Sequence, residues 1–143
     1  YELSVENIED KLNDVAGIRV ICSFVEDIYY LASMLSAQDD LTVLQVKDYI
    51  KNPKENGYRS LHLIIQTPIF LSDQKKNMRV EVQFRTIAMD FWASVDHKLK
   101  YKKNVKNPEM IAGELRKCAD IISSVDQRMQ EIRTMIEEGE NDD

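Results

Sequence analysis

The sequence predicts an α/β fold, in which a mixed β-sheet carries helices packed on it and a long helical segment follows. Short runs rich in Val, Ile and Phe alternate with segments of helical spacing, in the order strand, helix, three strands and helix. The last third of the chain then changes to one continuous helical pattern. The length of 143 residues is typical of a single domain.

The first elements are a strand, a helix and a second strand. Residues 17–24 (GIRVICSF) alternate and are rich in β-branched side chains, which is typical of a strand. Residues 26–37 place aliphatic side chains at helical spacing and predict a short amphipathic helix. Residues 41–47 (LTVLQVK) are expected to form the second strand.

Two further strands and a helix follow a loop. The turn signals Asn-Pro and Asn-Gly within 52–57 mark that loop. Residues 60–67 predict the third strand, and a polar connection at 72–77 leads to the fourth strand at 79–86, which has strict period two. A helix is expected at about 87–100, with Phe and Trp on its apolar side.

The C-terminal segment has the spacing of a coiled-coil seam. Its apolar residues alternate in steps of four and three, at Ile111, Leu115, Cys118, Ile122, Val125, Met129, Ile132 and Ile136. This helix either docks on its own domain or mediates self-association, and the pattern alone leaves both interpretations open. The expected organisation is therefore a folded domain at 1–107, a helical segment at 108–138 and an acidic tail at 139–143.

Charge is distributed unevenly along the chain and points to an anionic ligand. Residues 1–43 carry a net charge of −7, residues 44–107 of +7 and residues 108–143 of −6. The basic middle third would hold a compact phosphate-bearing ligand, whereas the acidic total disfavours nonspecific nucleic-acid binding. Unclustered glycines exclude a Walker-type loop. Two isolated cysteines and the absence of any membrane-spanning run or secretory signal predict a cytoplasmic protein without membrane contact.

Polar side chains share one face of the third and fourth predicted strands. Period two places Arg79, Glu81, Gln83 and Arg85 on the same side of the fourth strand, while His62 and Gln66 share a face of the third. The loop before the third strand adds Lys54, Asn56, Tyr58 and Arg59. This is either an exposed sheet face with cross-strand charge pairs or the set of groups that a phosphate-handling pocket needs.

Two residues have a structural and a functional interpretation each. Asp14 is either a turn residue or one of two carboxylates sharing a divalent ion, with Glu81 as the only partner on a strand among basic residues. Tyr58 is either an ordinary loop tyrosine or, beside Lys54 and Arg59, a ring that stacks on a nucleobase.

Four segments, NDVAGIR, KDYIKNPKENGYRSLH, VEVQFRT and MDFWASVDHKLKY, resemble the synthetase domain of the RelA/SpoT alarmone synthetases, above all the small single-domain members. The resemblance spans roughly residues 8–104. It implies a nucleotidyltransferase-like mixed sheet and a GTP pyrophosphokinase of the stringent response. Such an enzyme transfers pyrophosphate from ATP to the 3′-hydroxyl of GTP or GDP, with Mg²⁺, and releases AMP.

The resemblance also implies roles for individual residues. Asp14 would hold Mg²⁺, and Glu81 would share the metal and act as the base for the 3′-hydroxyl. Tyr58 would stack on guanine. The remaining residues would line the nucleotide sites: Lys54, Asn56 and His62 for the acceptor, Lys47 for ATP, and Gln83, Arg85 and Arg19 in the cleft.

Partners and departures follow from the same resemblance. It implies a homo-oligomer, typically a tetramer, and alarmone or single-stranded RNA as a regulator.

The sequence departs from the family pattern before the Tyr-Ile pair. The long enzymes have Arg-x-Lys-Asp there, and this chain has Gln45, Val46, Lys47 and Asp48, which leaves the choice between GDP and GTP open. No alarmone hydrolase activity is expected. The chain is expected to be a fragment or to lack an upstream basic segment that contacts ATP in relatives. The alternative function is a catalytically idle module that binds nucleotide, alarmone or RNA.

Overall fold

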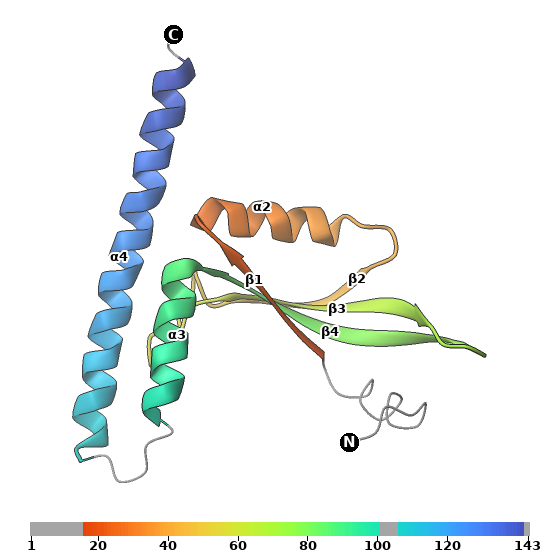
Figure 1. The fold of residues 1–143 in the computed structure, drawn as a ribbon, viewed down its shortest axis with the longest axis horizontal. Coiled ribbons are helices and arrows are strands. Elements are labelled where there is room, and N and C mark those ends of the chain that lie inside the picture. Colours follow the sequence, from red (N-terminus) through yellow and green to blue (C-terminus); the bar gives the residue numbers. More distant parts are fainter. Residues whose placement is uncertain (1–15, 101–105, 142–143) are drawn as a thin grey trace.

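The computed structural model describes residues 16–100 and 106–141. Within these residues, four strands form one sheet in the order β1-β4-β3-β2 (Figure 1). The strands are β1 (Ala16–Cys22), β2 (Thr42–Asp48), β3 (Leu61–Phe70) and β4 (Lys75–Thr86). The helices are α2 (Val25–Ser36), α3 (Ile87–Lys100) and α4 (Pro108–Asn141). The α/β class and the mixed sheet predicted from the sequence are confirmed.

The sheet is mixed because β1 pairs in parallel with β4, whereas β3 pairs antiparallel with both of its neighbours, β4 and β2. β3 and β4 extend further than predicted, since their ends pair through Phe70 and Lys75 in what was expected to be a polar connection. The register sets His62 opposite Gln83 and Ile64 opposite Glu81. One face of the central strands therefore carries the polar groups.

The opposite face of the sheet forms the core. Val80, Val82 and Phe84 of β4 are nearly inaccessible, as period two predicts for a half-buried strand. α2 covers this face and buries Ile28 and Ala32 against it. α2 and the polar face consequently lie on opposite sides of the sheet, which leaves the polar face open to form a site.

The junction between β4 and α3 is fixed by a buried hydroxyl. Thr86 Oγ1 accepts a hydrogen bond from the Met89 backbone N–H at 3.1 Å, the geometry of a helix N-cap. The same hydroxyl donates to Asp126 of α4 at 2.7 Å. Burial raises the pKa of the Asp126 carboxyl above its usual range. This contact ties α4 to the start of α3.

α4 lies beside α3 and extends past the sheet (Figure 1). It runs to Asn141, so it includes residues that the sequence pattern assigned to an acidic tail. Its seam divides in two. The first part, which includes Leu115 and Ile122, is partly buried against the domain. The second part of the seam, Val125, Met129, Ile132 and Ile136, is exposed, and the exposed Ile121 adjoins it one turn before Val125.

No helix in the part of the chain that the structure describes is both long and apolar enough to cross a membrane.

Candidate active site

A ring of polar side chains, joined by hydrogen bonds and one longer contact, occupies the polar face of β3 and β4. Gln83 Nε2 donates to Glu81 Oε1 at 2.7 Å, and Arg85 donates to Gln83 Oε1 at 2.9 Å. The same Arg85 nitrogen donates to the Tyr58 hydroxyl at 2.7 Å. Tyr58 Oη lies 2.8 Å from His62 Nε2, and His62 Nδ1 lies 3.6 Å from Glu81 Oε1, which closes the ring. Groups predicted from the sequence to share a face are thus directly connected.

The contacts of the Tyr58 hydroxyl favour one tautomer of His62. The hydroxyl oxygen accepts from Arg85, and its own proton is then available to donate to His62 Nε2. In that tautomer the neutral imidazole carries its proton on Nδ1, which faces Glu81. Burial lowers the pKa of His62, and the Arg85, Lys54 and Lys47 cations lower it further, while the Glu81 carboxylate partly opposes them. The ring is consequently built around an uncharged histidine.

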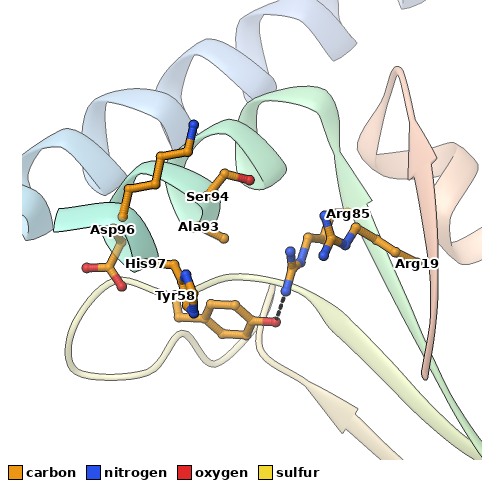
Figure 2. A pocket seen from close by; sticks show the side chains of 8 residues that line it. Arg19, Tyr58, Arg85, Ala93, Ser94, Asp96 and His97 are labelled. Atoms are coloured by element: carbon orange, nitrogen blue, oxygen red, sulfur yellow. Dashed lines mark hydrogen bonds between the residues drawn. The ribbon is translucent and has the colours of Figure 1, made fainter. Parts of the chain in front are cut away.

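A pocket of about 530 Å³ opens beside Tyr58. Figure 2 shows α3 on one side, the loop with Tyr58 on another, and Arg85 and Arg19 at one end. The lining residues are Arg19, Tyr58, Arg85, Ala93, Ser94, Asp96, His97 and Lys98. Among the described residues, the buried Nε–H of Arg85 has no hydrogen-bond partner. A buried guanidinium donor without an acceptor suits a phosphate oxygen or a carboxylate of a ligand.

The loop from Lys54 to Tyr58 is a tight turn that presents cations and rings together. Gly57 N donates to Lys54 O at 2.8 Å, and Lys54 N donates to Tyr58 O at 3.2 Å. Asn56 Oδ1 accepts from Tyr58 N at 3.0 Å. Lys54 Nζ lies over the rings of Tyr49 and Tyr58, 4.9 and 5.2 Å from their centroids. The loop therefore fixes one cation against two aromatic faces.

The remaining residues that the sequence predicted for the site do not belong to the ring. Lys47 pairs with His62 across β2 and β3. Arg19 reaches the pocket from β1 and contacts Asp90 Oδ1 at 3.2 Å, as Arg85 does at 3.1 Å. The Asn56 side chain is engaged within its own loop. Asp14 lies outside the described residues.

Sequence reasoning did not single out the contribution of α3. Asp90 bridges Arg19 and Arg85, and Ser94, His97 and Lys98 line the pocket. The available signal was the stripe of Asp90, Ser94 and His97 at steps of four and three. The apolar side of this helix, where Trp92 is buried, is the stronger of the two patterns in the sequence.

Metal binding at this site would depend on few protein groups. Within residues 16–100 and 106–141, no three His, Cys, Asp or Glu side chains are grouped so that they could hold an ion. Mg²⁺ sites that act on nucleotides commonly use one or two carboxylates and complete their shell with phosphates and water. Glu81, a quarter exposed and connected through Gln83 to Arg85, fits that donor set.

The free energy of unfolding is expected to fall as the pH drops below about 6.5, because the unfolded chain protonates His62 before the folded protein does. This one proton changes the free energy of unfolding by at most about 1.4 kcal/mol per pH unit. Below the lowered pKa of the folded state, His62 is protonated in both states and contributes no further slope. Chemical denaturation of the wild type and of His62→Gln, from about pH 5 to 8, measures it. Equal slopes for the two proteins would contradict the assignment.

A mixed sheet with one helix-covered face, and a cationic pocket with a carboxylate on the other, defines a nucleotidyltransferase-like domain. The profile of the region found in RelA / SpoT proteins matches residues 3–106, and the chain belongs to this family.

Similarity to particular proteins supports the assignment. GTP pyrophosphokinase YwaC of Bacillus subtilis is 43% identical over 136 residues, which cover 95% of this chain and 65% of that protein. The chain thus spans just under two thirds of that relative's length. The crystal structure of small alarmone synthetase 1 from Bacillus subtilis bound to its product pppGpp has a TM-score of 0.81 at 37% identity, over 90% of this chain and 68% of that one. The same synthetase bound to AMPCPP gives 0.72 at 34% identity, over 92% and 67%.

Proposed function

We propose that this chain catalyses transfer of pyrophosphate from ATP to the 3′-hydroxyl of GTP or GDP, yielding pppGpp or ppGpp and AMP. The observation that carries the proposal is the ring linking Glu81, through Gln83 and Arg85, to Tyr58 and His62 beside the pocket. A potential base, an aromatic platform and an anion-binding guanidinium are thereby held at fixed relative positions. Structures of a relative bound to pppGpp and to AMPCPP support nucleotides as the ligands.

The proposed step is a direct displacement at phosphorus. The 3′-oxygen of the acceptor attacks the β-phosphorus of ATP, the bond from that phosphorus to the α–β bridging oxygen breaks, and AMP leaves. The Glu81 carboxylate accepts the proton of the 3′-hydroxyl. Arg85 and Arg19 neutralise phosphate charge, and Lys47 lies against ATP. Transfers of this type depend mainly on positioning and charge neutralisation.

Acceptor recognition is assigned to the loop and its neighbours. Tyr58 stacks on guanine, and Lys54 contributes positive charge above the same ring. Asn56 acts by shaping the loop, since its side chain accepts the Tyr58 backbone N–H. His62 holds the Tyr58 hydroxyl as a neutral partner.

Mg²⁺ is the proposed cofactor, held by Glu81 and Asp14. When bound, the ion neutralises phosphate charge and helps to align the reacting phosphate. The Glu81 carboxylate, on a face that also carries Arg85 and Lys47, supports a divalent ion as the cofactor.

The test is AMP release from ATP by the full-length protein, in the presence of GTP or GDP and Mg²⁺. Expected is one AMP per pppGpp or ppGpp formed, with no release when guanine nucleotide is omitted. Nucleotide binding without AMP release would overturn the proposal and favour a regulatory binding module.

Self-association through α4 is proposed from its exposed apolar residues, with the homotetramer as the expected state. A contiguous exposed apolar patch of this kind is typical of an interaction surface. Ile122 is unsuitable for a test because it lines a small cavity with Gly57 and Trp92 of its own domain. Met129 and Ile132, each about half exposed, belong to the free surface.

The double variant Met129→Glu and Ile132→Glu is expected to dissociate the assembly, because burial of each aliphatic side chain contributes roughly 1.5–3 kcal/mol. Sedimentation velocity at micromolar concentration measures the change. Glu131→Lys, on the polar side of the same helix, is the control and should leave the assembly intact. A monomeric wild type would contradict this role of α4.

A further inference from the structure

The acceptor loop makes close contact with α4, although some sixty residues separate them in the sequence. Arg59 donates one hydrogen bond to the Ala119 carbonyl at 2.7 Å and another to Asp120 Oδ1 at 3.3 Å. The Arg59 side chain is only 13% exposed. Its hydrogen bond holds the pKa of the Asp120 carboxyl below its usual range. Arg116 donates to the Glu55 carbonyl from the other side. Both ends of the loop are therefore tied to one turn of α4.

The middle of the loop touches the same helical turn through its backbone. Gly57 is buried and has a φ of +97°, a conformation that residues with a Cβ rarely adopt. A Cβ placed there would lie 2.6 Å from the Cβ of Ala119. The absence of a side chain at Gly57 and the small side chain of Ala119 thus permit direct contact. A small cavity of about 10 Å³, which both residues line, lies beside this contact.

Trp92 closes the contact from α3. Its Nε1 donates to the Leu115 carbonyl at 2.8 Å, and its ring lines the same small cavity as Gly57 and Ala119. Because this is the only tryptophan in the sequence, its fluorescence reports on this contact alone.

We infer that the α4 turn from Leu115 to Asp120 positions the acceptor loop, so that Arg116, Ala119 and Arg59 set the affinity for the guanine nucleotide without touching it. This inference rests on the proposed function, in which Tyr58 and Lys54 contact the acceptor. Tyr58 lies on the short stretch of backbone between the anchors at Glu55 and Arg59. Lys54 directly precedes Glu55, and its backbone N–H donates to the Tyr58 carbonyl at 3.2 Å. Displacement of that stretch moves the ring and the ammonium group together. Lys47 and Arg19, which are assigned to the ATP phosphates, lie on β2 and β1 and not on this loop.

Two variants test the inference. Ala119→Val adds bulk where Gly57 approaches, and Arg116→Gln removes the hydrogen bond to Glu55 from a partly exposed position. Arg116→Gln keeps the test valid if the Ala119→Val variant does not fold. Two variants at exposed positions of α4 serve as matched controls. Ala112→Val repeats the change made at Ala119, and Lys117→Gln removes a positive charge as Arg116→Gln does.

Calorimetric titration of the full-length protein with GDP, and separately with a non-hydrolysable ATP analogue, measures the two affinities. Each test variant is expected to weaken GDP binding by about 2–10-fold, the effect of one lost hydrogen bond or its equivalent. ATP-analogue binding and both control variants should stay within about 2-fold of the wild type. Ala119→Val should also change Trp92 emission before any nucleotide is added, whereas Ala112→Val should not.

The outcomes separate this inference from the proposed function. If the wild type binds GDP and both test variants bind it equally well, the positioning role is wrong and the proposed function stands. Equal weakening of GDP and of the ATP analogue would show a general structural effect and would also overturn the positioning role. A wild type that binds no guanine nucleotide would remove the proposed function and this inference together.

Discussion

Glu81→Gln is expected to lower kcat for pyrophosphate transfer by at least about 10²-fold, the lower end of the contribution of a positioned general base. The change is isosteric, and the new amide oxygen can still accept the hydrogen bond from Gln83 Nε2. The ring of side chains should therefore persist, and the melting temperature should stay close to that of the wild type. At saturating Mg²⁺, KM for the acceptor should change little, since the contacts assigned to the acceptor are made by Tyr58 and Lys54. Steady-state AMP release measures kcat and KM together.

The matched control is Glu55→Gln, the same chemical change on the exposed acceptor loop. Glu55 contacts α4 through its backbone carbonyl, which the substitution leaves in place. Activity close to that of the wild type is expected. If Glu81→Gln kept a tenth or more of the wild-type kcat at saturating Mg²⁺, Glu81 would be neither the base nor an essential metal ligand.

The alternation in β3 and β4 was sufficient to predict which residues share the polar face. Period two in RVEVQFRT separates Val80, Val82 and Phe84 from Glu81 and Gln83, and the structure buries the first set. Burial of one face specifies the register of a strand strongly, which is why this inference from local sequence was reliable. The pairing of His62 with Gln83, however, is a contact between two strands, and no local sequence pattern encodes it.

Contacts between distant segments account for what the sequence left open. Asp90 contacts Arg85 and also Arg19, which is seventy-one residues away in the sequence, and the loop at Gly57 depends on Ala119. The heptad spacing of α4 identified an apolar stripe but could not say what covers it. In the structure, Ile122 packs on its own domain while Met129 is exposed. A hydrophobic period specifies a helix face, and only the fold assigns a partner to each part of it.

Tyr58→Ala is expected to raise KM for GTP or GDP by about 5–150-fold, with little change in KM for ATP. Stacking of an aromatic ring on a base is worth about 1–3 kcal/mol, and about 1.4 kcal/mol corresponds to tenfold in affinity. Tyr58 lines the pocket, and its ring is presented by a loop that hydrogen bonds hold at Lys54 and Asn56. Initial rates, with each nucleotide varied in turn, separate the two Michaelis constants.

Tyr58→Phe separates the contribution of the Tyr58 ring to acceptor binding from the contribution of its hydroxyl to the ring of side chains. Stacking needs only the ring, so KM for the acceptor should stay within about 2-fold of the wild type. The hydroxyl accepts from Arg85 and is bonded to His62, so its loss breaks the ring of side chains that reaches Glu81. The melting temperature and kcat are therefore expected to fall, although the loss of stacking alone would leave this variant silent. Arg85 retains its bond to Gln83, which limits the cost to that of one buried hydrogen bond, about 1–3 kcal/mol. If Tyr58→Ala weakened donor and acceptor equally, Tyr58 would be a structural loop residue and its stacking role would be wrong.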